Sequence, residues 1–281
     1  MDRQDKPILL IKFGSATLTK GGDKISRAKL EDIAHQVVLL RIKYDVILVC
    51  SGAIAAAKQF IKLERFGQGV KEKQALAAIG QPFLMRLIYE SFRDFEIPVG
   101  QCLLSYNDFK NETSKNNIFN TISELLKNGI LPIINENDTT ATEEIKFGDN
   151  DKLSALVASL LKVNQLILAS NTFGLYDDQQ QTIEKITDIK MVRKYISDEK
   201  SSQGTGGMHS KLDATEIAQQ NGIETWIVNG HEDGFLINAF EGKVKFTKIV
   251  GRSGSWEVGK SRYREVEISG NRDLETYSPK F

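Results

Sequence analysis

The chain has 281 residues, of which 41% are hydrophobic and 26% charged, and its 37 basic and 37 acidic residues cancel to a formal net charge of zero. This is the composition of a globular protein, and the lack of a basic excess argues against a nucleic-acid or anionic-membrane partner. Two cysteines and three histidines exclude a disulfide-rich scaffold and a histidine-rich metal site. Without an apolar run near ~18 residues or a signal-peptide core, we expect a cytoplasmic protein.

Short apolar runs alternate with helix-periodic stretches along most of the chain. The runs cover residues 8–11, 46–49, 130–134, 166–169 and 226–228, and they are apolar at every position, as in parallel strands covered on both faces. Helical spacing of apolar residues lies between them, at 30–40 and 153–161. The pattern predicts an α/β fold with a doubly wound, mostly parallel central sheet. Because the pattern ends near residue 246, we expect one domain over 1–245 and a short C-terminal appendage over 246–281.

Motifs that suit ligand binding follow the first two apolar runs, where folds of this kind bind ligands. Lys12 ends the first run beside Gly14, a placement that suits a phosphate contact or, alternatively, a solvated lysine before a turn. Ser51 and Gly52 end the second run ahead of small residues. Those residues either let a ligand approach the backbone or allow tight packing between a helix and a strand.

Three further motifs carry polar side chains at the starts of predicted helices or the end of a strand. Residues 135–138 (Asn-Glu-Asn-Asp) suit recognition of an amino acid's charged groups, with an Asx-rich turn as the alternative. Residues 149–151 (Asp-Asn-Asp) exceed what a helix N-cap requires, which favours a functional role. Residues 202–211 place three glycines and a final lysine at a helix start, as in a phosphate-binding nest, although a flexible linker is the alternative.

Together these motifs resemble the amino acid kinase family, over roughly residues 6–240. Residues 133–138 and 147–151 match the glutamate 5-kinase branch of that family, and residues 73–81 add a further matching segment. The resemblance implies an αβα sandwich that transfers the γ-phosphoryl group of ATP to the side-chain carboxylate of L-glutamate, the first step of proline biosynthesis. It implies ATP and Mg²⁺ as cofactors, with Mg²⁺ held mainly by ATP oxygens and water, so we expect no metal-binding side chain.

The resemblance also assigns a role to each matching position. Lys12, Asp151 and Lys211 would be catalytic: the lysines would hold the transferring phosphoryl group and Asp151 would organise them. Glutamate would be bound by Ser51, Gly52, Asp138 and Asn150. The nucleotide site would comprise Lys12, Ser170, Asn171, Thr205, Gly206, Gly207, Met208, His209, Ser210 and Lys211.

Departures from the family pattern leave alternatives open. Asn171 follows Ser170 where similar enzymes have Thr-Asp, which bears on nucleotide affinity. The chain stops too soon for a complete C-terminal PUA domain, an RNA-associated fold, so we expect no nucleic-acid partner. The family implies a homo-oligomer, a dimer or tetramer, and raises proline as a feedback inhibitor. The alternatives are another amino acid kinase, acting on acetylglutamate or aspartate, and a non-catalytic ligand-binding sensor.

Overall fold

An eight-stranded sheet forms the centre of the molecule in the computed structural model, which describes residues 6–61, 67, 69–141, 150–192 and 208–251. The strand order is β3-β4-β2-β1-β5-β7-β8-β6. Only the β7–β8 pair, among the described strands, is antiparallel. The strands are β1 (Ile8–Phe13), β2 (Asp45–Cys50), β3 (Val99–Leu104), β4 (Leu131–Glu136), β5 (Gln165–Ser170), β6 (Lys185–Ile186), β7 (Glu224–Asn229) and β8 (Thr247–Ile249).

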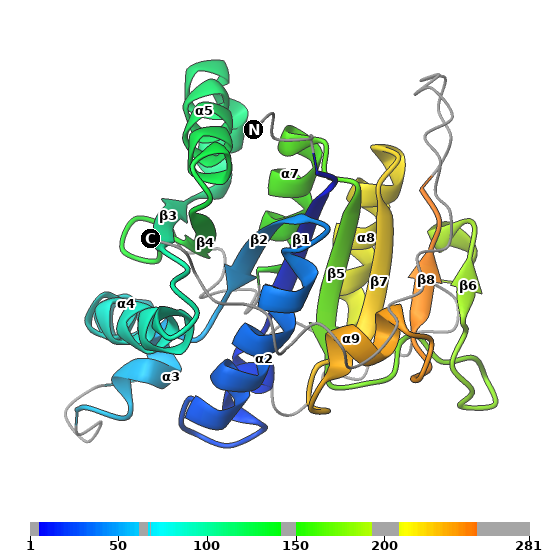
Figure 1. Ribbon diagram of the computed structural model, residues 1–281, viewed down its shortest axis with the longest axis horizontal. Helices are drawn as coiled ribbons and strands as arrows, with labels where there is room; N and C mark the ends of the chain where they lie inside the picture. The colour runs from blue at the N-terminus through cyan, green and yellow to red at the C-terminus, as the bar shows by residue number, and fades with distance from the viewer. Residues whose placement is uncertain (1–5, 62–66, 68, 142–149, 193–207, 252–281) are drawn as a thin grey trace.

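Helices cover both faces of this sheet. Figure 1 shows α2 and α9 in front of the strands and α7 and α8 behind them. The α-helices are α1 (Ser15–Thr19), α2 (Arg27–Leu40), α3 (Ala53–Ala57), α4 (Val70–Arg93), α5 (Glu112–Lys127), α7 (Asp151–Leu161), α8 (Met208–Gln220) and α9 (Phe235–Phe240), with 3₁₀ helices η2 (Tyr106–Lys110) and η3 (Ile189–Met191). The predicted α/β fold is confirmed, and the helices over 30–40 and 153–161 correspond to α2 and α7. None of the described helices is long and apolar enough to cross a membrane.

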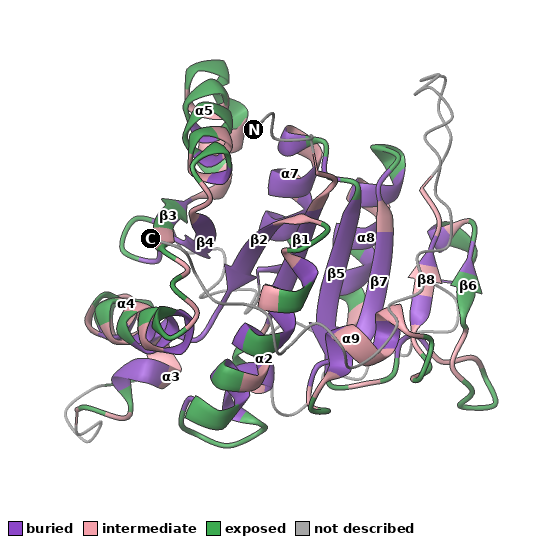
Figure 2. Cartoon of the chain, in the orientation of Figure 1, coloured by how far each residue is buried: buried purple, intermediate pink, exposed green. Residues whose placement is uncertain are grey.

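The side chains of β1 alternate between the two helical layers. Leu9, Ile11 and Phe13 join the core cluster that contains residues of α2, α4 and α9, whereas Leu10 joins the cluster with residues of α5, α7 and α8. By the same alternation, Lys12 lies on the face of the sheet that Leu10 occupies. Figure 2 shows β1, β2, β5 and β7 buried, and green exposed segments on the outer sides of α2, α4 and α5. Because both faces of the central strands are covered, these strands are apolar along their length.

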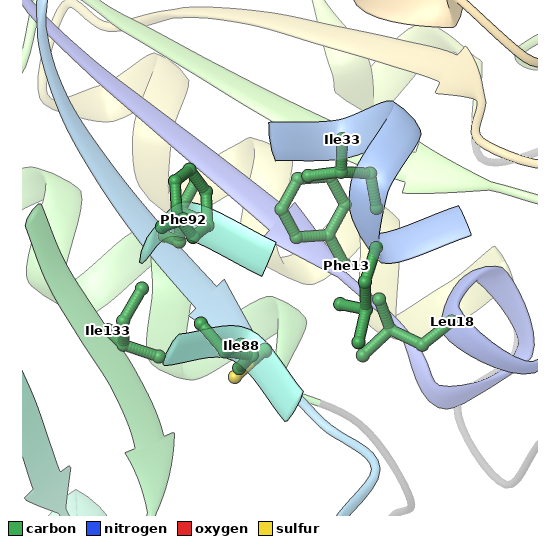
Figure 3. Close-up of a pocket in the computed structure, with 9 residues that line it drawn as sticks. Phe13, Leu18, Ile33, Ile88, Phe92 and Ile133 are labelled. Carbon is green, nitrogen blue, oxygen red and sulfur yellow. The ribbon is translucent and has the colours of Figure 1, made fainter. Parts of the chain in front are cut away.

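A small pocket lies in the front layer, and Figure 3 shows its apolar lining. It is lined by Phe13, Leu18, Leu30, Ile33, Leu48, Cys50, Ile88, Phe92 and Ile133. Phe13 faces this layer, while its neighbour Lys12 faces the other side of the sheet, as the alternation of β1 requires. The pocket therefore belongs to the apolar core and not to the polar residues at the strand ends.

Three strands, β3, β6 and β8, were not among the predicted elements. β6 covers only Lys185–Ile186, which is too short to stand out as an apolar run. β3 is an edge strand with several half-buried or exposed positions, so its residues do not form the continuous apolar run that marks the central strands. β8 covers Thr247–Ile249 and pairs with β7, so this part of the expected appendage belongs to the main sheet. Residues 252–281 lie outside the described residues, and the division at residue 245 stays a prediction.

Candidate active site

The predicted site residues lie at the carboxyl ends of neighbouring parallel strands. Lys12 is on β1, Ser51 follows β2, Asp138 follows β4 and Ser170 ends β5. Parallel strands bring these ends to one edge of the sheet, which is where doubly wound folds bind ligands. Gly52, after β2, has φ +112°, and a side chain there would also approach Ile25. Glycine therefore lets the chain turn sharply from β2 into α3 at this edge.

A buried carboxylate joins two lysines from distant parts of the chain. Asp151 is the first residue of α7 and is fully buried. Lys12 Nζ lies 2.5 Å from its Oδ1, and Lys211 Nζ, from α8, donates to its Oδ2 at 2.9 Å. Both lysines are buried as well. The structure thus brings together the three residues predicted to be catalytic, and their roles remain a prediction.

Electrostatics keep the carboxylate of Asp151 ionised. Burial alone would raise the pKa of Asp151, but the charges of Lys12 and Lys211 and their hydrogen bonds outweigh it and lower the pKa to about 2. The position of Asp151 in the first turn of α7 adds a favourable helix-dipole interaction. Counted over these three side chains, two ammonium groups outnumber one carboxylate, a balance that suits an anionic ligand such as a phosphoryl group.

A chain of side-chain amides runs along the same edge of the sheet. Asn150 Nδ2 donates to the Cys50 carbonyl oxygen at 3.0 Å and to Asn135 Oδ1 at 2.7 Å. Asn135 Nδ2 in turn donates to Gln81 Oε1, on α4, at 2.7 Å. Asn135 belongs to the 135–138 motif predicted to recognise charged groups but was assigned no role of its own, and Gln81 had no predicted role, although it ends the 73–81 segment that carries the family resemblance. The only feature of the sequence that marks Gln81 is its place after Gly80 at the end of the 73–81 segment. That feature does not predict a contact with a residue 54 positions away.

Asp138 is a buried carboxylate without an ion pair among the described residues. It is 8% exposed, and burial raises its pKa to about 6. No lysine, arginine or histidine of the described residues lies within ion-pairing distance of it. A buried carboxylate of this kind is stabilised when a cationic ligand group enters the site. The geometry therefore suits a ligand with an ammonium group.

The predicted nucleotide residues are only partly within the described structure. Ser170 is buried, with its hydroxyl 3.2 Å from that of Thr172, and Asn171 is exposed beside it. Met208, His209 and Ser210 form the first turn of α8 ahead of Lys211, and His209 is exposed. Thr205, Gly206 and Gly207 lie outside the described residues. The structure therefore places Ser170, Asn171 and the start of α8 without testing their roles.

The donor set at this edge is poor in metal ligands. No group of three or more histidine, cysteine, aspartate or glutamate side chains that suits a metal ion occurs within the described ranges. Asp151, the most buried carboxylate of the site, is already paired with two ammonium groups. The expectation that no side chain serves as a metal ligand stays a prediction.

Comparison with known proteins tests the family resemblance directly. Residues 7–229 match the model of the amino acid kinase family. The chain belongs to the amino acid kinase family. The predicted resemblance is thereby confirmed over most of the chain.

The chain is also similar to individual proteins of the family. The chain is 42% identical over 238 residues to the glutamate 5-kinase of Clostridium acetobutylicum, a match that covers 82% of this chain and 89% of the relative. It is 35% identical over 263 residues to the glutamate 5-kinase of Clostridium perfringens, covering 89% and 98%. Among solved structures, carbamate kinase from Giardia lamblia bound to AMP-PNP aligns with a TM-score of 0.62 at 16% identity, covering 88% of this chain and 99% of that one. This last likeness shows a shared fold.

Proposed function

We propose that this protein transfers the γ-phosphoryl group of ATP to the side-chain carboxylate of L-glutamate and forms L-glutamyl 5-phosphate, the first step of proline biosynthesis. The observation that carries the proposal is the ion cluster of Lys12, Asp151 and Lys211 at the carboxyl edge of the sheet. The two relatives named glutamate 5-kinase, of which the chain spans 89% and 98%, support glutamate as the substrate.

The reaction suits a site without a general base. A γ-carboxylate has a pKa of about 4.3, so glutamate arrives ionised and attacks the γ-phosphorus directly. The obstacle is the approach of an anion to a polyanion, and catalysis must supply positive charge where negative charge spreads during transfer. Lys12 and Lys211 supply two ammonium groups, and Asp151 holds both in place. Mg²⁺, when bound with ATP, would neutralise further phosphate charge.

The other end of the site suits the α-amino group of a free amino acid. The buried Asp138 carboxylate offers its charge to an α-ammonium group, and Ser51 and Asn150 border the same edge. Capping the α-amine leaves Asp138 without its partner, which costs about 2–5 kcal/mol for a desolvated pair. N-Acetylglutamate should therefore be at least ~30-fold poorer in kcat/KM than L-glutamate, since each 1.4 kcal/mol corresponds to about tenfold.

A substrate panel tests this function. L-Glutamate, L-aspartate and N-acetylglutamate are each incubated with Mg-ATP, and the acyl phosphate is trapped with hydroxylamine. We expect hydroxamate chiefly from L-glutamate. Equal rates with N-acetylglutamate would contradict the assignment in favour of another amino acid kinase, and ATP binding without any hydroxamate would favour a non-catalytic sensor.

The remaining features of the proposal concern assembly and regulation. We infer a homo-oligomer, a dimer or tetramer, a cytoplasmic location, and proline as a feedback inhibitor of glutamate phosphorylation. Light scattering after size-exclusion chromatography measures the oligomeric state. Initial rates with proline varied at subsaturating glutamate measure the last, and a rate independent of proline would remove feedback inhibition from the proposal.

A further inference from the structure

Three buried polar atoms at the substrate end of the site have no hydrogen-bond partner within the described structure. They are Gln81 Nε2, Asn150 Oδ1 and Ser51 Oγ. Buried polar groups are nearly always paired, so such atoms point to a ligand that completes their bonding. An amide nitrogen only donates, an amide oxygen only accepts, and a hydroxyl does both. The set therefore offers a free amino acid both donors and an acceptor.

The amide chain determines which of these atoms faces the ligand. Both hydrogens of Asn150 Nδ2 are used, one by the Cys50 carbonyl and one by Asn135 Oδ1, so Asn150 presents only its oxygen. Asn135 Oδ1 also accepts from the Glu136 backbone N–H, and its Nδ2 donates to Gln81 Oε1. Gln81 is thereby held with its oxygen toward Asn135 and its nitrogen free to donate elsewhere.

The position of Gln81 in the fold places it at the end of the site remote from the lysines. Asn135 lies on β4, which is separated from β1 by β2, and each strand step spans about 4.8 Å. The γ-carboxylate must lie near Lys12, on β1, where phosphoryl transfer takes place. The α-carbon and its two charged groups therefore lie toward β4, beside Gln81 and Asp138.

We propose that Gln81 is a specificity-determining residue: its Nε2 donates a hydrogen bond to the α-carboxylate of glutamate, while its Oε1 holds Asn135 and, through it, Asn150. The acceptor Asn150 Oδ1 and the carboxylate of Asp138 then take the α-ammonium group. This inference rests on the function proposed above and deepens it, because it explains how the site tells the two ends of the zwitterion apart.

Gln81→Glu separates the two tasks of this residue. The introduced carboxylate keeps an oxygen that accepts from Asn135, but it loses the donor and places a negative charge against the α-carboxylate. We expect the KM for L-glutamate to rise by about 10- to 100-fold, the range for losing a hydrogen bond to a charged group, with kcat changed less than about threefold because the loss falls equally on ground and transition states. Gln101→Glu, the same exchange at an exposed position of the edge strand β3, should match the unmodified enzyme.

A second substrate makes the test independent of folding. L-Glutamic acid 1-amide (L-isoglutamine) keeps the reactive γ-carboxylate but carries a neutral amide in place of the α-carboxylate, so it can donate to the introduced carboxylate. The preference for glutamate over this amide, as a ratio of kcat/KM values, should fall at least ~10-fold in Gln81→Glu and stay constant in Gln101→Glu. A solely structural role for Gln81 would leave that ratio unchanged.

The possible failures are distinguishable. An unmodified enzyme that phosphorylates glutamate, with a Gln81→Glu variant of unchanged substrate preference, overturns the role of Gln81 alone. An unmodified enzyme without glutamate turnover overturns the proposed function and this inference together. A variant that has lost thermal stability and turnover is replaced by Gln81→Met, which removes donor and acceptor alike. That variant should discriminate less between glutamate and its 1-amide than the unmodified enzyme does, and an unaltered ratio there would also contradict the role.

Discussion

The carboxylate of Asp138 is buried beyond the end of β4, and burial raises its pKa from 3.8 to about 6. A displacement of that size corresponds to about 3 kcal/mol in favour of the neutral form. Since the folded-state pKa lies above the unfolded one, protonation stabilises the fold fully below pH 3.8, and this contribution is lost as the pH rises through 6. At neutral pH the residue therefore costs stability, and the proposed function supplies the reason, since the charge would bind the α-ammonium group of the substrate.

Asp138→Asn should consequently raise stability while it impairs function. At pH 7.5 we expect the free energy of unfolding to increase by about 1–3 kcal/mol, because the amide carries no charge to desolvate. The kcat/KM for L-glutamate should fall at least ~30-fold. Urea unfolding at several pH values and steady-state kinetics measure both. The stability gain should shrink between pH 7 and pH 4, and a variant less stable than the unmodified protein at pH 7.5 would argue against the raised pKa.

Lys12 differs from Asp138 because its charge is compensated within the protein. In Lys12→Met, Asp151 keeps Lys211 as a partner, so the fold should persist. We expect kcat to fall by roughly 10²–10³-fold, the scale for a lost electrostatic stabiliser, with the KM for glutamate little changed. Lys20→Met, at an exposed lysine that pairs with Asp233, is the matched control. Turnover within threefold of the unmodified enzyme would assign Lys12 a structural role.

At the scale of elements, α3 and α4 meet at Gly80. A Cβ atom there would lie 1.7 Å from the carbonyl oxygen of Ala53, so any side chain would force the two helices apart. Replacing glycine by alanine inside a helix ordinarily stabilises it by about 1 kcal/mol. At Gly80 the overlap of the added Cβ atom with the backbone of Ala53 makes the substitution destabilising instead. The close approach also positions Gln81, the next residue of α4.

Gly80→Ala should therefore destabilise the protein by about 1–3 kcal/mol, the usual cost of overpacking. The kcat/KM for glutamate should fall as well, because α4 carries Gln81. Denaturant unfolding compared with Ala78→Gly, at an exposed position of the same helix, gives the test: that control should lose only about 1 kcal/mol. A Gly80→Ala protein as stable as the unmodified one would mean that the two helices separate freely.

Elements and site residues differed in how far the sequence alone could predict them. β1, β2, β4, β5 and β7 were predictable because burial on both faces requires apolar residues along the strand. The edge strand β3 and the short β6 and β8 offered no such run. Lys12, Asp151 and Lys211 were predicted through the family resemblance, and the structure gathers them. The hydrogen bond between Asn135 and Gln81 was not predictable, since it depends on how closely α4 approaches the end of β4.

At the scale of the whole molecule, substrate binding should stabilise the fold even without ATP. Glutamate would complete the bonding of Gln81 on α4, Ser51 after β2 and Asn150 at the N-cap of α7. A ligand at 100 times its dissociation constant stabilises the fold by about 2.7 kcal/mol. For a chain of this size each 1 kcal/mol raises Tm by about 2–4 °C. We expect a rise of about 5–10 °C by calorimetry with L-glutamate, and a rise of at most about 3 °C in Asp138→Asn at the same glutamate concentration, since binding ~30-fold weaker leaves less than about 1 kcal/mol of stabilisation. An equal shift with N-acetylglutamate would indicate binding that ignores the α-amine.

The sharing of one carboxylate by Lys12 and Lys211 also has a consequence for synthesis on the ribosome. β1 leaves the ribosome first, although it lies in the middle of the sheet. Lys211 is synthesised 60 residues after Asp151. Contacts between such distant segments form late, because the entropy cost of closing the intervening loop precedes the favourable energy of the contact. A nascent chain that ends before α8 holds Asp151 with a single ammonium group. The charge proposed to bind the phosphoryl group is thus assembled only after β1 to β6 have been synthesised, and prematurely terminated chains are left without it.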